Sequence, residues 1–335
     1  MRPALTVLTD PMPVGRFRLK ETVRRVSRPL TDLIRPRPAW LRGAFYRGHF
    51  AVTRSLVEGL RKIGASANYN PKREPEVGEV VIVLCGIDAL RQAILWKRAG
   101  YIARLLAGPN ILVFPSEHAN LIAAPEVDYC VTPADWVCRV YERDCPALKG
   151  RCVAWPAGVD TEYWCPGPGK RETREVLIYD KHAIGLARPV SDYVHVLKRQ
   201  NYSVSVVTYG SYTPEEFLLK LRRASLMVGF STSESQGIVW AEAWSADVPT
   251  LLWFQDQFTW PAGRTFATST APYLCDSTGM FFTSVAEFEN SLMQWETSRE
   301  SFHPRRWVLE HMSDEVCARQ LCRLAGICGS AADAI

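Results

Sequence analysis

Short apolar runs alternate along this chain with longer stretches in which apolar positions recur every three or four residues. The short runs have the length and composition of buried strands, and the longer stretches have the period of amphipathic helices. Such alternation predicts parallel sheets covered by helices, because parallel strands need helix-length crossovers between them. The expected strands are residues 4–8, 79–85, 110–114 and 127–131 in the first half, and 174–180, 203–209, 226–230 and 249–254 in the second.

Helices are expected between these strands and at the end of the chain, over residues 49–63, 88–105, 133–144, 189–200, 214–223, 236–246 and 304–325. Residues 156–172, rich in proline, glycine and charge, separate the two halves, and a Pro- and Arg-rich insertion at 11–42 interrupts the first. A chain of 335 residues is long enough for two domains. We therefore predict an α/β protein with Rossmann-like domains over residues 1–160 and 161–302, whose strand ends face a shared crevice.

The charge of the chain is unevenly distributed. The formal net charge is +5, but residues 1–47 hold eleven basic side chains against three acidic ones, so this segment carries +8 and the remainder −3. Between residues 16 and 37 arginines alternate with apolar positions, a pattern that suits a helix on an anionic membrane surface or another polyanion. A solvated surface helix explains the pattern equally well. Both interpretations stay open, and no motif elsewhere indicates a nucleic-acid partner.

The ten cysteines predict neither a metal site nor a disulfide framework, because no two form a C-x-x-C pair and most lie in apolar segments such as VIVLCGI. Buried free thiols are typical of a reducing compartment. No stretch reaches the roughly 18 to 20 apolar residues of a spanning helix, and the apolar run before Asp10 is too short for a secretory signal. We expect a cytoplasmic protein, peripheral to the inner face of the membrane if residues 16–37 bind lipid.

The most specific pattern lies in FSTSESQGIVWAEAWSADVPTLLW, residues 230–253, which predicts a strand, a polar turn, a helix and a second strand. Gly237 falls in the first turn of the helix, where unpaired backbone N–H groups and the helix dipole attract phosphate. Glu234 precedes this helix end and Glu242 follows eight residues later. Carboxylates there suit a neutral, hydroxyl-rich ligand, since they accept hydrogen bonds from sugar hydroxyls. Two ordinary helix glutamates, one capping and one solvent-facing, are the alternative interpretation.

The Glu-x7-Glu arrangement in SESQGIVWAEAW resembles the signature of retaining GT-B glycosyltransferases of the family-4 kind. Four other stretches resemble elements of that family in the same order: its glycine loop and first helix at 42–64, its pre-linker stretch at 127–141, its interdomain element WPAGVDTEYWCP at 155–166 and its closing helix at 305–324. The resemblance implies a GT-B fold, two Rossmann-like domains facing a central cleft. It also implies a C-terminal helix, residues 303–328, that packs on the first domain.

The resemblance also assigns roles in the second domain. Glu234 would contact the donor sugar and Glu242 the ribose hydroxyls. Lys181, with Arg188 as the second candidate, would neutralise the diphosphate. This chain has Asp180-Lys181 where the family has Gly-Arg, and lysine lacks the planar fork of arginine. The other donor-binding candidates are Gly237, Ile238, Gln236, Gly43 and Gly48.

His118 completes the catalytic candidates, Glu234 and Lys181 being the others. It follows a first-domain strand in NILVFPSEHAN, where the family has a histidine near the donor sugar. A structural hydrogen-bonding role explains such a histidine equally well. Gln236 stands where the family has an aromatic residue, and the second domain is short by one strand and one helix that help build the nucleotide pocket in the family, so the resemblance does not define the base pocket.

The reaction that the resemblance implies is sugar transfer from a nucleotide-sugar donor to a saccharide, lipid-linked or protein acceptor, with retention at the anomeric carbon. No Asp-x-Asp element is present, so we expect no obligatory metal and no cofactor beyond the donor. A degenerate GT-B protein that binds a nucleotide, glycan or partner without catalysis is the alternative. An oxidoreductase is disfavoured, because neither half has G-x-G-x-x-G after its first strand.

Overall fold

The computed structural model describes residues 3–10, 48–169, 174–260 and 263–327. The chain forms two compact units, one made of Met1–Gly158 with Asp314–Ile335 and the other of Val159–Ser313. The chain therefore passes from one unit to the other twice. The first passage follows Gly158, beside the predicted boundary at 160, and the second follows Ser313, eleven residues after the predicted boundary at 302. The basic insertion at 11–42, the proposed membrane segment 16–37 and Gly43 lie outside the described residues.

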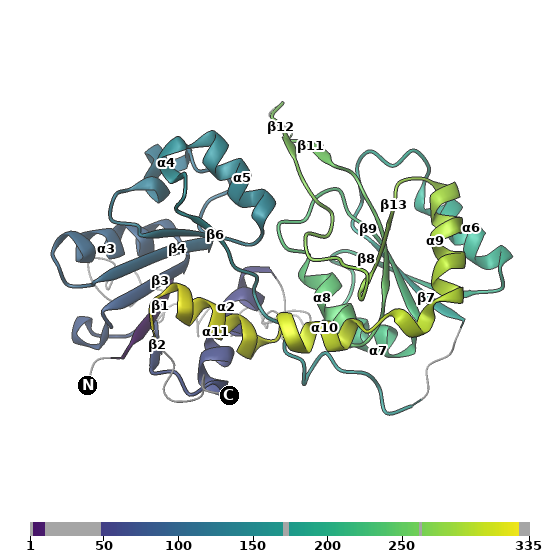
Figure 1. Cartoon of the computed structure of the whole chain (residues 1–335), viewed down its shortest axis with the longest axis horizontal. Helices are drawn as coiled ribbons and strands as arrows, with labels where there is room; N and C mark the ends of the chain where they lie inside the picture. The colour runs from purple at the N-terminus through teal and green to yellow at the C-terminus, as the bar shows by residue number, and fades with distance from the viewer. Residues whose placement is uncertain (1–2, 11–47, 170–173, 261–262, 328–335) are drawn as a thin grey trace, which may run out of the picture. The chain divides into compact units, whose positions relative to one another are not determined.

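The first unit is built on a six-stranded parallel sheet in the order β2-β1-β3-β4-β5-β6 (Figure 1). Its strands are β1 (Leu5–Thr9), β2 (Ala67–Tyr69), β3 (Val80–Cys85), β4 (Arg104–Asn110), β5 (Tyr129–Thr132) and β6 (Cys152–Ala154). Its helices are α2 (Gly48–Lys62), α3 (Ile87–Arg98), α4 (Glu117–Asn120), α5 (Asp135–Asp144) and α11 (Asp314–Leu324). β1 is buried throughout and β3 over its four central residues, as expected for strands covered on both faces.

The second unit is built on a five-stranded parallel sheet in the order β13-β10-β9-β7-β8. Its strands are β7 (Glu175–Asp180), β8 (Ser203–Thr208), β9 (Leu226–Phe230), β10 (Thr250–Trp253) and β13 (Gly279–Phe282), with a separate antiparallel pair β11 (Gln257–Thr259) and β12 (Thr265–Ala267). Its helices are α6 (Val190–Arg199), α7 (Pro214–Arg223), α8 (Ile238–Ser245), α9 (Val285–Thr297) and α10 (Pro304–His311). The chain runs from β8 through α7 directly to β9, as the short second domain of the sequence predicts.

Local chemistry explains where these helices begin. Thr213 caps α7 with a complete capping box, in which its side chain accepts from the Glu216 N–H and the Glu216 carboxylate accepts from the Thr213 N–H. Pro214 occupies the first helical position, where its missing N–H costs nothing. Ser284 caps α9 in the same way through the Glu287 N–H. The start of α7 matches the helix predicted over 214–223, whereas no helix was predicted over α9 although its cap is equally local.

One predicted strand is wrong. Only Asn110 of the run NILVF at 110–114 lies in a strand. The fourth strand of the sheet is β4, Arg104–Asn110, which begins where the sequence predicted the end of a helix. Glycine and proline usually weaken or interrupt a strand. Gly108 nevertheless lies within β4, because β5 approaches it closely. A Cβ at Gly108 would lie 1.9 Å from the Val131 carbonyl oxygen. The helix α3 therefore ends at Arg98 rather than at 105.

The single closing helix predicted over 304–325 is also wrong, because it is two helices. α10 ends at His311, and α11 begins at Asp314. Between them the Met312 carbonyl accepts a hydrogen bond from the Val159 N–H at 2.9 Å, and Val159 forms a parallel bridge with Ser313. This pairing takes the backbone out of the helical hydrogen-bond pattern. α10 packs on α8 of the second unit, where the Trp307 and Trp244 ring centroids are 5.6 Å apart.

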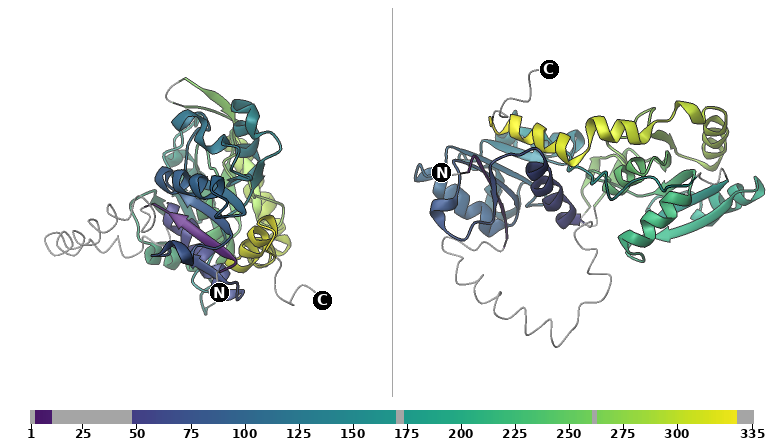
Figure 2. Two further views of the ribbon diagram at one scale, coloured as in Figure 1. Left: turned by 90° about the vertical axis from the view of Figure 1, so that its left-hand side faces the viewer. Right: turned by 90° about the horizontal axis from the view of Figure 1, so that it is seen from below.

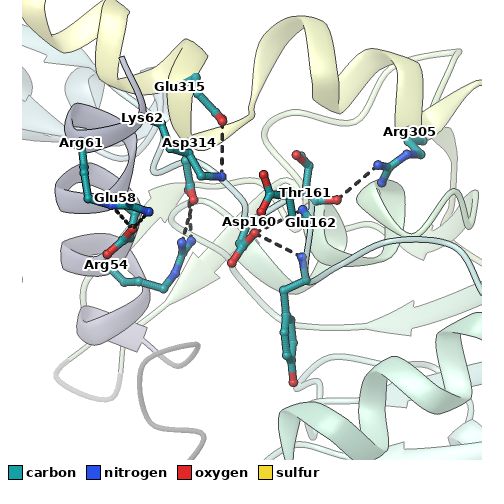
Figure 3. Close-up of polar contacts among 11 residues, drawn as sticks. Arg54, Glu58, Arg61, Lys62, Asp160, Thr161, Glu162, Arg305, Asp314 and Glu315 are labelled. Atoms are coloured by element: carbon teal, nitrogen blue, oxygen red, sulfur yellow. Dashed lines mark hydrogen bonds and ion pairs between the residues drawn. The ribbon is translucent and has the colours of Figure 1, made fainter. Parts of the chain in front are cut away.

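α11 packs along α2 in the first unit (Figures 1 and 2). The Arg54 guanidinium donates to both oxygens of Asp314, at 2.6 and 3.0 Å, and the Asp314 side chain is fully buried. Lys62, about two helical turns after Arg54 at the end of α2, pairs with Glu315 at 3.3 Å (Figure 3). Within the second unit, Arg305 on α10 donates to the Thr161 and Ser245 carbonyls. A two-point ion pair thus anchors α11 to α2.

Gly59 lies on α2 directly against α11. Gly59→Ala is expected to lower the free energy of unfolding by about 1–3 kcal/mol through overpacking. Helix propensity alone predicts the opposite sign, a gain of about 1 kcal/mol. Packing should win, because a Cβ at Gly59 would lie 2.3 Å from the Asp314 carbonyl oxygen and 2.9 Å from Ala318 Cβ. Urea unfolding measures the difference, with Gly169→Ala as the control in open space. A Gly59→Ala protein more stable than the wild type would contradict this packing.

Across the described ranges, we find no helix that combines the length and the apolar character needed to cross a membrane.

Candidate functional site

The polar turn at 231–235 follows β9 and leads into α8, as predicted. β9 lies between β10 and β7 in the second sheet, so the turn emerges at the carboxyl ends of parallel strands. Lys181 follows β7 at the same edge, and its backbone N–H donates to the Phe230 carbonyl at 2.9 Å. Ligands of open α/β sheets bind at this edge.

Lys181 and Glu234 form an ion pair. The Lys181 Nζ lies 2.7 Å from Glu234 Oε1, and the Ser231 hydroxyl donates to the same oxygen at 2.6 Å. Glu234 is buried, with 8% of its surface exposed, whereas the Lys181 side chain keeps 30% exposure. The Lys181 ammonium also lies over the Tyr209 ring, 5.0 Å from its centroid. The structure therefore brings together two of the three predicted catalytic residues of this chain.

The segment that contains β11 and β12 holds the turn in place. The Glu234 N–H donates to the Ser269 carbonyl at 2.9 Å, and the Ser233 and Thr268 hydroxyl oxygens are 2.6 Å apart. On the other side of the turn, the Thr232 hydroxyl accepts from the Ile184 N–H at 2.6 Å. These bonds fix the backbone of the turn from several directions, and with it the direction of the Glu234 side chain.

The amino end of α8 begins with a left-handed residue. Gly237 is the N-cap, with φ of 77°, and no described side chain caps this helix end. Glycine is required there for two reasons: its φ is positive, and a Cβ would lie 2.3 Å from Trp240 Cδ1. Trp240 is fixed by a hydrogen bond from its Nε1 to the Thr270 carbonyl at 2.8 Å. The N–H groups at the start of α8, including that of Ile238, thus lie beside the Glu234 turn.

Glu242 and Gln236 are both buried, with 7% and 6% of their surfaces exposed. Glu242 is not the solvent-facing helix glutamate of the alternative interpretation. The Tyr179 hydroxyl lies near both carboxylates and accepts a hydrogen bond from the Tyr212 hydroxyl at 3.1 Å. Burial raises the pKa of Tyr179 far above its usual value, and Tyr212, Glu234 and Glu242 raise that pKa further. Tyr179 therefore stays a neutral phenol near the Glu234 and Glu242 carboxylates.

The other candidates lie elsewhere. His118 belongs to the first unit, exposed on α4, and together with Ala119 and Asn120 it forms a left-handed turn with φ values of 50°, 57° and 58°. Non-glycine residues seldom adopt such values, and strain of this kind concentrates at functional sites. Arg188 is exposed between β7 and α6, and Gly48 is exposed at the start of α2 with φ of 49°. Gly43 lies outside the described residues.

Sequence reasoning missed several residues of this site. Ser231 was part of the predicted polar turn, but its bond to Glu234 had no sequence signal. Thr268 and Ser269 lie about 35 residues from the turn in a stretch without a motif. Tyr209 ends a predicted strand and was expected to be an ordinary strand residue. Ser231 contacts Glu234 within the turn itself. Thr268, Ser269 and Tyr209 contact the turn or Lys181 only through the tertiary fold.

Two α/β units, each with a parallel sheet and helical crossovers, define the class: an α/β protein of two Rossmann-like domains. No family model and no curated protein sequence matches the chain. The structure of Anabaena HepE in complex with UDP and glucose matches it with a TM-score of 0.51 and 10% identity, over 97% of this chain and 100% of that one.

Two further solved structures are similar. One is accessory secretory protein 1, 2 and 3 in Streptococcus pneumoniae, with a TM-score of 0.50 and 11% identity over 74% of this chain and 52% of that chain. The other is the lipopolysaccharide outer core galactosyltransferase WaaB in its apo form, with a TM-score of 0.46 and 13% identity over 96% and 98%. Identities this low establish the fold and nothing more. The predicted GT-B fold is confirmed.

Proposed function

We propose that this protein transfers a sugar from a nucleotide-sugar donor to an acceptor hydroxyl, with retention at the anomeric carbon and without an obligatory metal. The observation that carries the proposal is the Lys181–Glu234 pair, 2.7 Å apart, beside the uncapped amino end of α8. A cation and a helix amino end together suit a diphosphate. A buried carboxylate beside them suits the hydroxyls of the attached sugar.

In this proposal each group has one task. Lys181 and the backbone N–H groups of Gly237 and Ile238 hold the diphosphate, Glu234 binds donor-sugar hydroxyls and Glu242 binds the ribose. Gln236, Arg188, Gly43 and Gly48 remain donor-binding candidates, and His118 is the candidate that the first unit contributes. The structure of HepE in complex with UDP and glucose supports this choice of ligands for a chain of the same fold.

The chemistry requires charge stabilisation more than acid–base work. The bond from the anomeric carbon to the phosphate oxygen breaks, and a bond from that carbon to the acceptor oxygen forms on the same face of the sugar. The acceptor's proton leaves with the departing diphosphate. Negative charge grows on the diphosphate in the transition state, so preorganised donors and a cation at Lys181 supply the largest stabilisation. The acceptor is a saccharide, a lipid-linked sugar or a protein.

A catalytically degenerate protein that binds a nucleotide, glycan or partner is the second candidate. The direct passage from β8 through α7 to β9, which leaves the second sheet with five strands, favours this candidate. Asp180-Lys181 in place of Gly-Arg points the same way, because the lysine cannot form the planar two-point contact of arginine with phosphate. Binding without turnover is the expected result for this candidate.

Thermal unfolding in the presence of UDP, GDP, ADP and their sugars tests the proposal. A ligand at a hundred times its dissociation constant adds about 2.7 kcal/mol to stability, which raises the Tm of a domain of this size by about 5–10 °C. The nucleosides uridine, guanosine and adenosine, which lack the diphosphate, serve as the control ligands and should give no shift of this size. Release of nucleoside diphosphate from the stabilising nucleotide sugar then separates transferase from binding protein. Absence of any shift with every nucleotide and nucleotide sugar would rule out the transferase, and would leave only a protein that binds a glycan or a partner.

A further inference from the structure

The edge strand β8 ends beside the Lys181–Glu234 pair. β8 pairs with β7 in parallel, in register from Glu175 and Ser203 to Asp180 and Thr208. The next residue, Tyr209, donates its backbone N–H to the Asp180 carbonyl at 2.8 Å. The carboxyl end of this edge strand is thus held directly against the residue that precedes Lys181.

The Tyr209 ring is placed next to the cation of the site. Its centroid lies 5.0 Å from the Lys181 Nζ, which in turn lies 2.7 Å from Glu234 Oε1. Tyr209 remains 58% exposed, so most of its ring is open to solvent although it ends a strand. A single exposed aromatic side chain needs no explanation by itself. Its position beside the lysine that would hold the diphosphate is what distinguishes this one.

The turn that follows Tyr209 is anchored at its far end as well. The Ser211 N–H and hydroxyl both donate to the Thr208 carbonyl, at 3.0 and 2.6 Å. Tyr212 then packs against Phe217, with 5.1 Å between ring centroids, and donates to the Tyr179 hydroxyl. Gly210 between them has φ of 83°, which the turn requires and which glycine adopts without strain. The Tyr209 ring is therefore carried on a fixed turn.

We propose that Tyr209 is the stacking platform for the nucleobase of the donor, which makes it the residue that selects nucleotides over other diphosphates. This inference rests on the proposed function, because it takes Lys181 as the diphosphate contact. A base is joined to its diphosphate by a single ribose, so a base must lie close to a lysine-bound diphosphate, and the exposed ring is there. Stacking on an aromatic side chain tolerates every base, because each has a flat π face.

Calorimetric titration of the full-length chain tests this with two kinds of ligand, inorganic pyrophosphate and whichever of UDP, GDP and ADP binds the wild type most tightly. Tyr209→Ala is expected to weaken nucleoside diphosphate binding by about 5- to 150-fold, the range of base–aromatic stacking. Pyrophosphate binding should not change. Tyr209→Phe should restore the nucleotide affinity, and Met293→Ala, an exposed apolar residue on α9, is the surface control.

The pattern of affinities separates the possible failures. If Tyr209→Ala weakens nucleotide and pyrophosphate equally, Tyr209 acts by positioning Lys181 and the platform is refuted. If it changes neither affinity, the base lies elsewhere and the platform is again refuted. If the wild type binds no nucleoside diphosphate at all, the proposed function itself fails, and the platform fails with it. Circular dichroism of each variant confirms that the fold is unchanged.

Discussion

Lys181→Ala is expected to lower the rate of diphosphate release from the nucleotide-sugar donor by about 10²- to 10³-fold, the usual effect of removing one preorganised charge-stabilising donor. The side chain is 30% exposed, so its loss should leave the second unit folded. Because the interaction strengthens as the diphosphate departs, the loss should appear in kcat more than in KM. Steady-state kinetics of nucleoside diphosphate release measure both constants, and thermal unfolding checks the fold.

Lys198→Ala is the matched control, since Lys198 is an exposed lysine in the last turn of α6 of the same unit. It should leave the kinetics unchanged. Glu234→Ala should also abolish turnover, whereas Glu234→Gln keeps the shape of the side chain and part of its hydrogen bonding to sugar hydroxyls. Wild-type turnover in both Lys181→Ala and Glu234→Ala would defeat the transferase.

Asp314→Ala is expected to lower the stability of the first unit by about 3–5 kcal/mol, the cost of breaking a buried ion pair by removing one partner. The Asp314 side chain is fully buried and that of Arg54 is 11% exposed, so water cannot replace the lost carboxylate easily. Because the two units can unfold separately, a single midpoint does not suffice. Hydrogen exchange of the α2 and α11 amides should be measured beside guanidinium unfolding.

Two variants show whether burial causes this effect. Glu310→Ala removes the Arg306–Glu310 pair, in which the side chains are 76% and 51% exposed, and should cost no more than about 1 kcal/mol. Arg54→Met combined with Asp314→Leu replaces the buried pair by apolar groups and should recover most of the loss. Equal losses for Glu310→Ala and Asp314→Ala would show that the Arg54–Asp314 pair contributes no more than a surface pair.

Prediction from the sequence succeeded where local chemistry decides the outcome. β9 occupies the predicted residues 226–230, and α8 begins two residues after the predicted start at 236. A continuous apolar run, a polar turn and a glycine all lie within about fifteen residues of one another there. These local signals predict the strand and the helix without any contact from a distant part of the chain. The failure at 104–114 has the opposite cause. Local sequence rules predict that Gly108 interrupts a strand, but the neighbouring strand β5 comes so close that only glycine fits there.

The sequence by itself therefore determined the α/β class, the two halves and the placement of Glu234 just before a helix. These follow from the periods of apolar residues and from turn chemistry, which act over a few residues. Only the tertiary structure decided that Lys181 meets Glu234 from 53 residues away, that Thr268 contacts the turn, that Tyr209 lies beside the lysine and that Arg54 pairs with Asp314 across 260 residues. Such contacts depend on strand order and helix packing, which hydrophobic periodicity leaves unspecified.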